Sequence, residues 1–171
     1  ANVVVNDLGT SVEGEGSDPE VPAEVAAEIR DAGGEAVAHH GDISDTDVAV
    51  DLVETAVEEY GRLDGVANFA GVLRDGWLTN LSDDDWDTAV GTNLTGHFGL
   101  LRAAAAHWQS LEDPDPQRSF LAVSSMGALG NPGQVNYSAT KAGILGMVRA
   151  ASTELARSNV RVNSLIPSGF T

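Results

Sequence analysis

The sequence predicts an α/β protein whose parallel strands are covered by helices on both faces. Short β-branched or apolar runs alternate along the chain with longer amphipathic stretches. Glycines and serine-plus-aspartate signatures mark where the helices end and begin. The 171 residues suffice for a single domain, and no repeat or interdomain linker interrupts them. This alternation is typical of a doubly wound parallel sheet.

The first half of the chain indicates two strands, each followed by a helix. The β-branched run at 3–5 is typical of a buried strand. Gly33 and Gly34 stop the first helix, since glycine readily adopts the conformation that ends helices. Ser44 and Asp47 form a candidate capping box, in which the serine caps the second helix. The expected elements are a strand at 3–5, an acidic loop at 9–19, a helix at 20–32, a strand at 35–40 and a helix from 44 to 61.

The second half continues the alternation and contains the longest predicted helix. Ser82 and Asp85 repeat the capping signature at its start. The segment 112–116 contains two prolines and ends it. The expected elements are strands at 63–69, 119–123 and 160–166, and helices at 82–110 and 137–156.

Charge limits the classes of partner. Lys and Arg total 9 and Asp and Glu total 26, so the formal net charge is −17. Such a surface repels nucleic acid and anionic membranes, and we expect neither as a partner. With one lysine to eight arginines, the acidic composition predicts a halophilic protein, because salt screens repulsion between carboxylates. An acidic protein from a mesophile with a GC-rich genome is the alternative.

Cysteine and histidine give no sign of a metal site. The chain has no cysteine, which excludes disulfides and thiolate ligands. Its four histidines form no paired metal-binding motif, and His97 and His107 are expected to pack on one helix or lie at its surface. No apolar run is long enough to span a membrane and no secretion signal is evident, so we expect a cytoplasmic protein.

Lys141, the only lysine of the chain, follows Tyr137 by four residues. Side chains at this spacing share one helix face. A neighbouring ammonium favours the ionised form of a phenol, which otherwise titrates near pH 10. The pair therefore indicates an acid/base catalyst usable near neutral pH. The same spacing also arises by chance, so its meaning depends on the surrounding residues.

Further motifs surround this pair in a defined order. Ser124 lies thirteen residues before Tyr137, and Asn93 lies in the sequence Thr92-Asn93-Leu94. Asn68-Phe69-Ala70-Gly71 precedes both, and Val160-Arg161-Val162-Asn163-Ser164-Leu165-Ile166-Pro167 follows. In this order the set resembles the short-chain dehydrogenase/reductase family, over residues 2–171. The resemblance implies a Rossmann-like fold and a nicotinamide-dependent oxidoreductase.

The resemblance implies a role for each catalytic candidate. Tyr137 would exchange a proton with the substrate oxygen, while Lys141 would assist it and bind the nicotinamide ribose. Ser124 would polarise the substrate oxygen, and the thirteen-residue spacing selects it over Ser125. Asn93 would position a water that relays protons from Lys141, although a buried, satisfied amide is the alternative. Hydride transfer to a ketone builds negative charge on oxygen, where hydroxyl donors stabilise it.

The resemblance also implies the cofactor contacts. Asp7 would accept hydrogen bonds from the ribose hydroxyls and repel a 2′-phosphate, which favours NAD over NADP. Asp42 and Ile43 match the family's adenine-contacting pair, although Asp42 could equally serve only the entry to a helix. Phe69 replaces the family's second asparagine, and Ser168 replaces a family glycine. The complete expected set is Asp7, Asp42, Ile43, Asn68, Ala70, Gly71, Tyr137, Lys141, Pro167, Ser168, Gly169 and Thr171.

The family's first strand and its glycine-rich TGxxxGxG turn do not occur in this sequence. Gly9, Gly14 and Gly16 have the wrong spacing, and the acidic residues among them would repel a pyrophosphate. We therefore interpret 9–19 as a plain acidic loop. The absent strand is central in a doubly wound sheet, so we expect residues 1–171 to be one incomplete domain, truncated at both ends. Alone, it should fold poorly and bind dinucleotide weakly.

The segments 3–9, 71–75 and 96–98 look most like (3R)-hydroxyacyl-CoA dehydrogenases and 3-oxoacyl-carrier-protein reductases. This likeness implies a 3-hydroxyacyl or 3-oxoacyl thioester as substrate, carried by coenzyme A or by acyl carrier protein. The alternative is a non-catalytic fragment that needs a partner or missing segments. The resemblance also implies a homodimer or homotetramer through the helices at 82–110 and 137–156.

Overall fold

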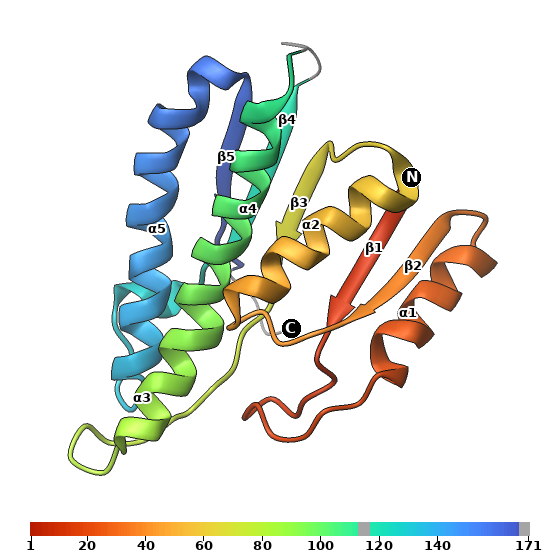
Figure 1. Ribbon diagram of the computed structural model, residues 1–171. Helices are drawn as coiled ribbons and strands as arrows, with labels where there is room; N and C mark the ends of the chain where they lie inside the picture. The colour runs from red at the N-terminus through yellow and green to blue at the C-terminus, as the bar shows by residue number, and fades with distance from the viewer. Residues whose placement is uncertain (113–116, 168–171) are drawn as a thin grey trace.

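Strand and helix alternate along the chain in the predicted order, which confirms the α/β class (Figure 1). The structure, a computed structural model, describes residues 1–112 and 117–167. The strands are β1 (Asn2–Asp7), β2 (Glu35–His40), β3 (Gly65–Asn68), β4 (Arg118–Val123) and β5 (Val160–Leu165). The helices are α1 (Glu20–Asp31), α2 (Thr46–Tyr60), α3 (Asp83–Val90), α4 (Gly96–Ser110) and α5 (Val135–Leu155).

The strands form two separate parallel sheets within the described residues. β1 pairs with β2, while β4 lies between β3 and β5. β1 and β3 are not paired with each other, which is the division expected without a central strand. Helix α2 contacts both β1 and α4, so helix packing connects the two sheets (Figure 1).

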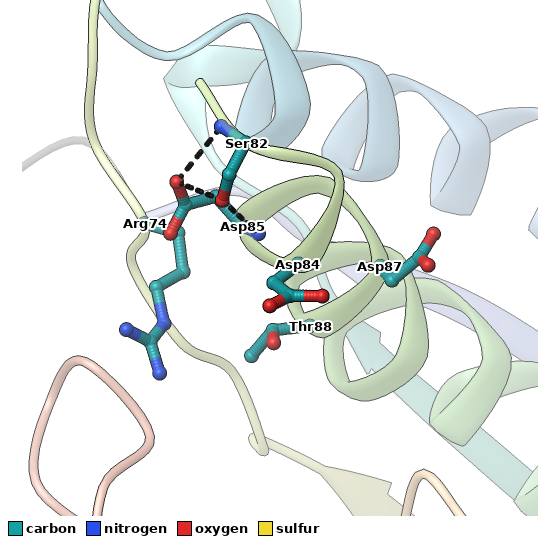
Figure 2. Close-up of a pocket in the computed structure, with 6 residues that line it drawn as sticks. All are labelled: Arg74, Ser82, Asp84, Asp85, Asp87 and Thr88. Carbon is teal, nitrogen blue, oxygen red and sulfur yellow. Dashed lines mark hydrogen bonds between the residues drawn. The ribbon is translucent and has the colours of Figure 1, made fainter. Parts of the chain in front are cut away.

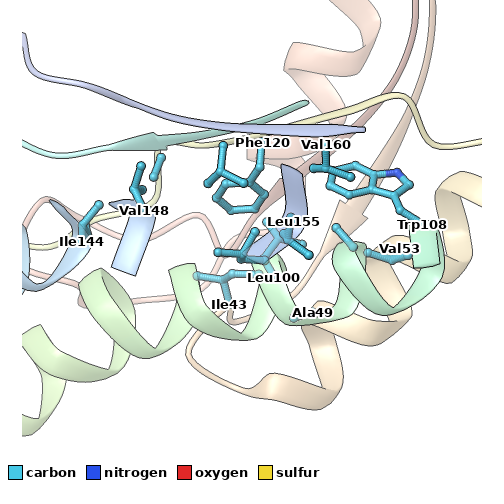
Figure 3. Close-up of a cluster of buried hydrophobic side chains, with 14 residues drawn as sticks. Ile43, Ala49, Val53, Leu100, Trp108, Phe120, Ile144, Val148, Leu155 and Val160 are labelled. Carbon is cyan, nitrogen blue, oxygen red and sulfur yellow. The ribbon is translucent and has the colours of Figure 1, made fainter. Parts of the chain in front are cut away.

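The main hydrophobic core lies between the β3–β4–β5 sheet and the helices α2, α4 and α5 (Figure 3). Phe120 of β4 is fully buried at its centre, and truncating such a ring to alanine costs about 3–5 kcal/mol. Trp108 of α4 is also buried, and its indole N–H donates to the Leu63 carbonyl at 2.8 Å. This core therefore holds β4 rigidly against the helices that carry the catalytic candidates.

Two glycines let α4 approach the start of α2 closely. A Cβ on Gly96 would lie 2.9 Å from Cγ2 of Ile43, and one on Gly99 would lie 3.1 Å from Cγ2 of Thr46. Ile43, expected to contact adenine, directs its side chain into the core and is 5% exposed. Any contact of this residue with adenine would therefore have to come from its backbone.

The two predicted capping boxes have different outcomes. At α3 the box is confirmed, because Ser82 Oγ accepts from the Asp85 N–H at 3.1 Å and the Asp85 carboxylate accepts from the Ser82 N–H at 3.0 Å. At α2 the prediction of Ser44 as the cap is wrong. Asp45 is the N-cap, and its carboxylate accepts from the Asp47 N–H at 2.9 Å. Asp45 has the extended backbone that a cap requires, and its short carboxylate reaches the first turn.

The helix predicted over 82–110 contains a π-helical turn at Gly91–Thr95, between α3 and α4. A π turn widens the helix locally, and such turns frequently occur at functional sites. Asn93 lies within it.

No helix among the described residues is both long and apolar enough to cross a membrane.

Candidate active site

The candidates from the strands lie at the carboxyl ends of those strands. Asp7 ends β1, Asn68 ends β3 and Ser124 directly follows β4. The arrowheads of β1 and β3 point the same way in Figure 1. Ligands of open α/β sheets bind outside this edge. Pro167 follows β5, whereas Ser168, Gly169 and Thr171 lie outside the described residues.

Tyr137 and Lys141 lie on one face of α5. The Lys141 ammonium is 5.4 Å from the centroid of the Tyr137 ring, within the range of a cation–π contact. Tyr137 is partly exposed, whereas Lys141 is 4% exposed. The ring of Tyr137 lies against Gly127, where a Cβ would come within 3.1 Å of Cε1. The expected pairing of phenol and ammonium is therefore present in the fold.

The ammonium of Lys141 is held by the backbone of β4. Its Nζ donates to the Val123 carbonyl at 2.9 Å, and no described carboxylate pairs with it. Burial disfavours the charged form and lowers the pKa of Lys141 to about 8. A lysine with such a pKa exchanges protons more readily near neutral pH than an exposed one.

The two neighbouring serines face different partners. Ser124 is 2% exposed, and its hydroxyl donates to the Lys141 carbonyl at 2.7 Å. Ser125 is partly exposed, and its Oγ lies near Gly127, the glycine that the Tyr137 ring also contacts. In this geometry the Ser124 hydroxyl must rotate away from the helix backbone before it can meet a substrate oxygen.

Asn93 is fully buried, and its side-chain amide bonds both backbone groups of Val72. Its Oδ1 accepts from the Val72 N–H at 2.8 Å, and its Nδ2 donates to the Val72 carbonyl at 3.0 Å. A Cβ on Gly71 would lie 3.1 Å from this Oδ1 and 3.6 Å from Nζ of Lys141. Asn93 is thus a satisfied buried amide that also lies beside Lys141, and glycine at 71 permits this close approach.

The cofactor candidates differ in how much of each side chain is free. Asn68 is 4% exposed, and its Oδ1 accepts from the Ala70 N–H at 3.0 Å. Asp7 is exposed, and one carboxylate oxygen accepts from the Gly9 N–H at 2.7 Å. Asp42 forms a similar turn with the Ser44 N–H at 2.9 Å, as the helix-entry alternative predicts. Each exposed carboxylate keeps its second oxygen for other partners.

Asn136 is a site residue that the sequence analysis missed. It is fully buried, and its Nδ2 donates to the carbonyls of Arg74 at 2.8 Å and Asp85 at 3.2 Å. Its Oδ1 accepts from the Tyr137 N–H at 2.8 Å. Asn136 therefore fixes the helix turn that carries Tyr137 to two other segments. Its position next to Tyr137 was the only sequence signal.

His97 is a fully buried residue and does not lie at the surface. It has no exposed area, and neither ring nitrogen has a hydrogen-bond partner among the described residues. Burial, followed by the nearby charge of Lys141, lowers the pKa of His97 to about 4. The imidazole is therefore neutral at neutral pH. Packing on the predicted helix is confirmed for this residue.

An acidic hollow of about 520 Å³ lies at the start of α3 (Figure 2). Asp85 is already bonded to Ser82, as the dashed lines in Figure 2 show. Within the described ranges, no group of three or more potential ligands is placed to hold a metal ion. The hollow is lined by Arg74, Ser82, Asp84, Asp85, Asp87 and Thr88.

The family model of the short chain dehydrogenases matches residues 8–171. The chain belongs to the short-chain dehydrogenase family. A short-chain type dehydrogenase/reductase of Mycobacterium tuberculosis is 39% identical over 171 residues, which cover 100% of this chain and 59% of that protein. A hydroxyacyl-CoA dehydrogenase of the same organism is 39% identical, over 100% of this chain and 54% of its own length.

Two further comparisons extend the family assignment. The 3-oxoacyl-[acyl-carrier-protein] reductase of Staphylococcus aureus is 36% identical, over 99% of this chain and 64% of its own length. A crystal structure of a short chain dehydrogenase from Mycobacterium avium superposes with a TM-score of 0.88 at 39% identity, and covers 97% of this chain and 58% of that one. This short-chain dehydrogenase chain therefore spans a little over half the length of several relatives.

Short-chain dehydrogenases use nicotinamide cofactors, and the residues present fit such a group in part. The exposed carboxylate of Asp7 at the end of β1 suits a ribose, and the glycine at 71 leaves the backbone after β3 uncovered by a side chain. Lys141 could bond a ribose hydroxyl beside the same edge. No glycine-rich TGxxxGxG turn, the element that would suit the pyrophosphate, occurs in the sequence.

Proposed function

We propose that the protein interconverts a secondary alcohol and a ketone with NAD as the cofactor. The observation that carries this proposal is the position of the Lys141 ammonium, 5.4 Å from the Tyr137 ring centroid and bonded to the end of β4. A phenol next to a buried ammonium at the carboxyl edge of a parallel sheet is suited to proton exchange with a bound substrate.

The side chains would divide the proton chemistry among themselves. The bound nicotinamide supplies or accepts the hydride. Tyr137 would give its hydroxyl proton to the developing alkoxide, and Lys141 would replenish it, since the pKa of this lysine is lowered to about 8. Ser124, after its hydroxyl rotates, would donate to the same oxygen. Asn93 would keep Val72 and Gly71 in place beside Lys141.

Asp7 supports NAD rather than NADP as the cofactor. A carboxylate at the end of this strand accepts hydrogen bonds from ribose hydroxyls and repels a 2′-phosphate. No lysine or arginine precedes Arg30 in the sequence, so no nearby cation in this segment would neutralise that phosphate. Comparing the dissociation constants of NAD and NADP tests this part of the proposal.

We propose a 3-hydroxyacyl or 3-oxoacyl thioester as the substrate. The hydroxyacyl-CoA dehydrogenase and the 3-oxoacyl reductase among the relatives support this class. Exposed apolar side chains from the segment after β4 to the first residue of α5 would suit an acyl chain, with Met126 at 52%, Leu129 at 81% and Val135 at 40% exposure. An acyl-chain length series would show rising kcat/KM with length if these side chains contact the substrate.

Substituting Tyr137 tests the function directly. Tyr137→Phe removes the proton donor and should lower kcat on the order of 10²–10⁴-fold, while the dissociation constant of NAD stays unchanged. The assay uses the full gene product in high salt, with 3-hydroxyacyl thioesters and simple secondary alcohols. Turnover retained by the variant would refute the proposed role of Tyr137.

The division of the sheet favours a second candidate, an incomplete enzyme. β1 and β3 are not paired, and we propose that the active form has a further strand between them, supplied by residues outside this chain. The 171-residue chain alone should then show no cooperative melt and only weak NAD binding. A cooperative melt together with tight NAD binding by this chain would contradict the proposal.

We also propose that the protein assembles as a homodimer or homotetramer through α4 and α5. A Cβ on Gly146 of α5 would meet no atom within 4 Å, so this part of the helix surface can approach another helix closely. Phe98 of α4 is 48% exposed and has the Arg102 guanidinium 5.2 Å from its ring centroid. A monomeric mass in light scattering would count against this assembly.

A further inference from the structure

The acidic loop after β1 contains an ordered turn, Ser11–Glu15, that packs against the segment after β3. We propose that this turn is a positioning element for Asn93 and, through it, for the proposed active site: the turn holds Val72 from one side while Asn93 holds it from the other. The inference rests on the proposed function. It replaces the interpretation of residues 9–19 as a plain loop.

The turn has a defined backbone of its own. The Ser11 N–H donates to the Glu15 carbonyl at 2.8 Å, and the Gly14 N–H donates to the Ser11 carbonyl at 2.9 Å. At the base of the loop, the Asp18 N–H donates to the Leu8 carbonyl at 2.9 Å. These hydrogen bonds lie within the loop and fix the shape of the turn. A displacement of the turn would therefore also displace the residues that it contacts.

Three contacts join the turn to the segment after β3. The Leu73 N–H donates to the Val12 carbonyl at 2.9 Å. Gly14 lies against Val72, and a Cβ on this glycine would come within 2.9 Å of Val72 Cγ1. The third contact is an ion pair, in which Glu15 Oε1 lies 3.6 Å from Arg74 Nη1.

Of these contacts, packing and the backbone bond carry more weight than the ion pair. The side chain of Glu15 is 74% exposed, and exposed ion pairs contribute about 0–1 kcal/mol. Val72, in contrast, is 5% exposed, so its side chain has little room to move away from Gly14. Close-packed interiors transmit such displacements to their neighbours.

The opposite side of the same segment is held by residues of the active site. Asn93 bonds both backbone groups of Val72, at 2.8 and 3.0 Å. Asn136 donates to the Arg74 carbonyl at 2.8 Å and accepts from the Tyr137 N–H. A displacement of Val72 would therefore reach Asn93 directly and Tyr137 through Asn136.

Two glycines of the loop provide a matched test. Gly14 and Gly16 have φ of +83° and +93°, so an alanine at either position introduces comparable backbone strain. Only the new Cβ at Gly14 meets Val72, whereas a Cβ at Gly16 meets nothing within 4 Å. In the full gene product, Gly14→Ala should lower kcat by about 10- to 100-fold, because small misplacements of catalytic groups are costly. Gly16→Ala should keep kcat close to that of the parent.

A rescue variant separates positioning from general damage. Val72→Ala removes Cγ1 but keeps both backbone hydrogen bonds to Asn93. Added to Gly14→Ala, it should return kcat to the level of Val72→Ala alone, while the dissociation constant of NAD stays the same in all variants. An equal loss of kcat in Gly14→Ala and Gly16→Ala would overturn the inference. It would also be overturned if the double variant of Gly14→Ala and Val72→Ala folds but its kcat stays below that of Val72→Ala.

A second readout does not depend on the proposed reaction. The side-chain amide resonance of Asn93, assigned with Asn93→Asp, should shift in Gly14→Ala and stay in place in Gly16→Ala. If this resonance is unchanged in Gly14→Ala, the positioning role is wrong whatever the reaction. If it shifts but the parent turns over no alcohol or thioester, the proposed function fails and the structural coupling stands.

Discussion

Ser124 donates its hydroxyl hydrogen to the backbone carbonyl of Lys141 at 2.7 Å, while the Lys141 ammonium donates to the carbonyl of Val123 at 2.9 Å. The end of β4 and the second turn of α5 thus hold each other by two bonds in opposite directions. This arrangement places Lys141 beside Tyr137. The Val123 carbonyl accepts from one of the three N–H groups of the ammonium, which has no described carboxylate partner.

The two serines can be distinguished by paired substitutions. If Ser124 turns toward the substrate oxygen, Ser124→Ala should lower kcat on the order of 10²-fold, because it removes a donor that stabilises the developing charge. Ser125→Ala should change kcat by only a few fold. Steady-state kinetics of both variants with one thioester substrate provides the measurement. The reverse result would assign the substrate contact to Ser125 and refute the selection by spacing.

Asn136 should be important for stability. Asn136→Ala leaves the partly buried carbonyls of Arg74 and Asp85 and the Tyr137 N–H without their side-chain partner, which should lower the free energy of unfolding by about 1–3 kcal/mol. Asn131→Ala is the control, since that asparagine is exposed and bonds the side chain of Gln134. Urea denaturation of both variants measures the difference. Equal effects would contradict the role of Asn136.

His97 should make the protein sensitive to acid. Above pH 6.5 the imidazole is neutral in the folded and unfolded states, so it costs nothing. Between pH 6.5 and about 4 the unfolded state binds a proton that the folded state does not, and the free energy of unfolding falls. A pKa lowered from 6.5 to about 4 corresponds to a loss on the order of 3 kcal/mol, complete below pH 4.

The contribution of His97 is measured against a variant that cannot titrate. In His97→Leu the free energy of unfolding should fall less steeply between pH 6.5 and 4 than in the parent, although carboxylates titrate in both. His40→Gln, at an exposed position, should follow the parent curve. Parallel curves for the parent and His97→Leu would show that the buried imidazole does not cause the acid sensitivity.

Salt should stabilise the protein. With a formal net charge of −17, carboxylates repel one another across the folded surface, and screening within about 10 Å at 0.1 M salt reduces this repulsion. The melting temperature of the full gene product should therefore rise from low to molar KCl. Sucrose at matched osmolarity is the control for preferential exclusion. A melting temperature independent of salt would remove the halophilic interpretation.

Several elements could be predicted because their causes are local. The alternation of strands and helices follows from hydrophobic periodicity within each segment. The capping box of Ser82 and Asp85 lies within one turn of helix, and so does the pairing of Tyr137 with Lys141. Such features depend on residues that are neighbours in sequence, whatever the rest of the chain does.

Other features depend on contacts between distant segments. Asn93 lies in a π turn and bonds Val72, which is 21 residues away, and Asn136 bonds Arg74, which is 62 residues away. The choice of Asp45 over Ser44 as a helix cap likewise follows from backbone conformation rather than residue type.

The sequence by itself therefore determined the fold class, the family resemblance and the pairing of Tyr137 with Lys141, because these depend on spacings of a few residues and on motif order. Only the tertiary structure decided the direction of the Ser124 hydroxyl, the burial of His97 and the contact of Gly14 with Val72. These features result from packing between segments that are distant in the sequence. The local sequence pattern around each residue therefore does not predict them.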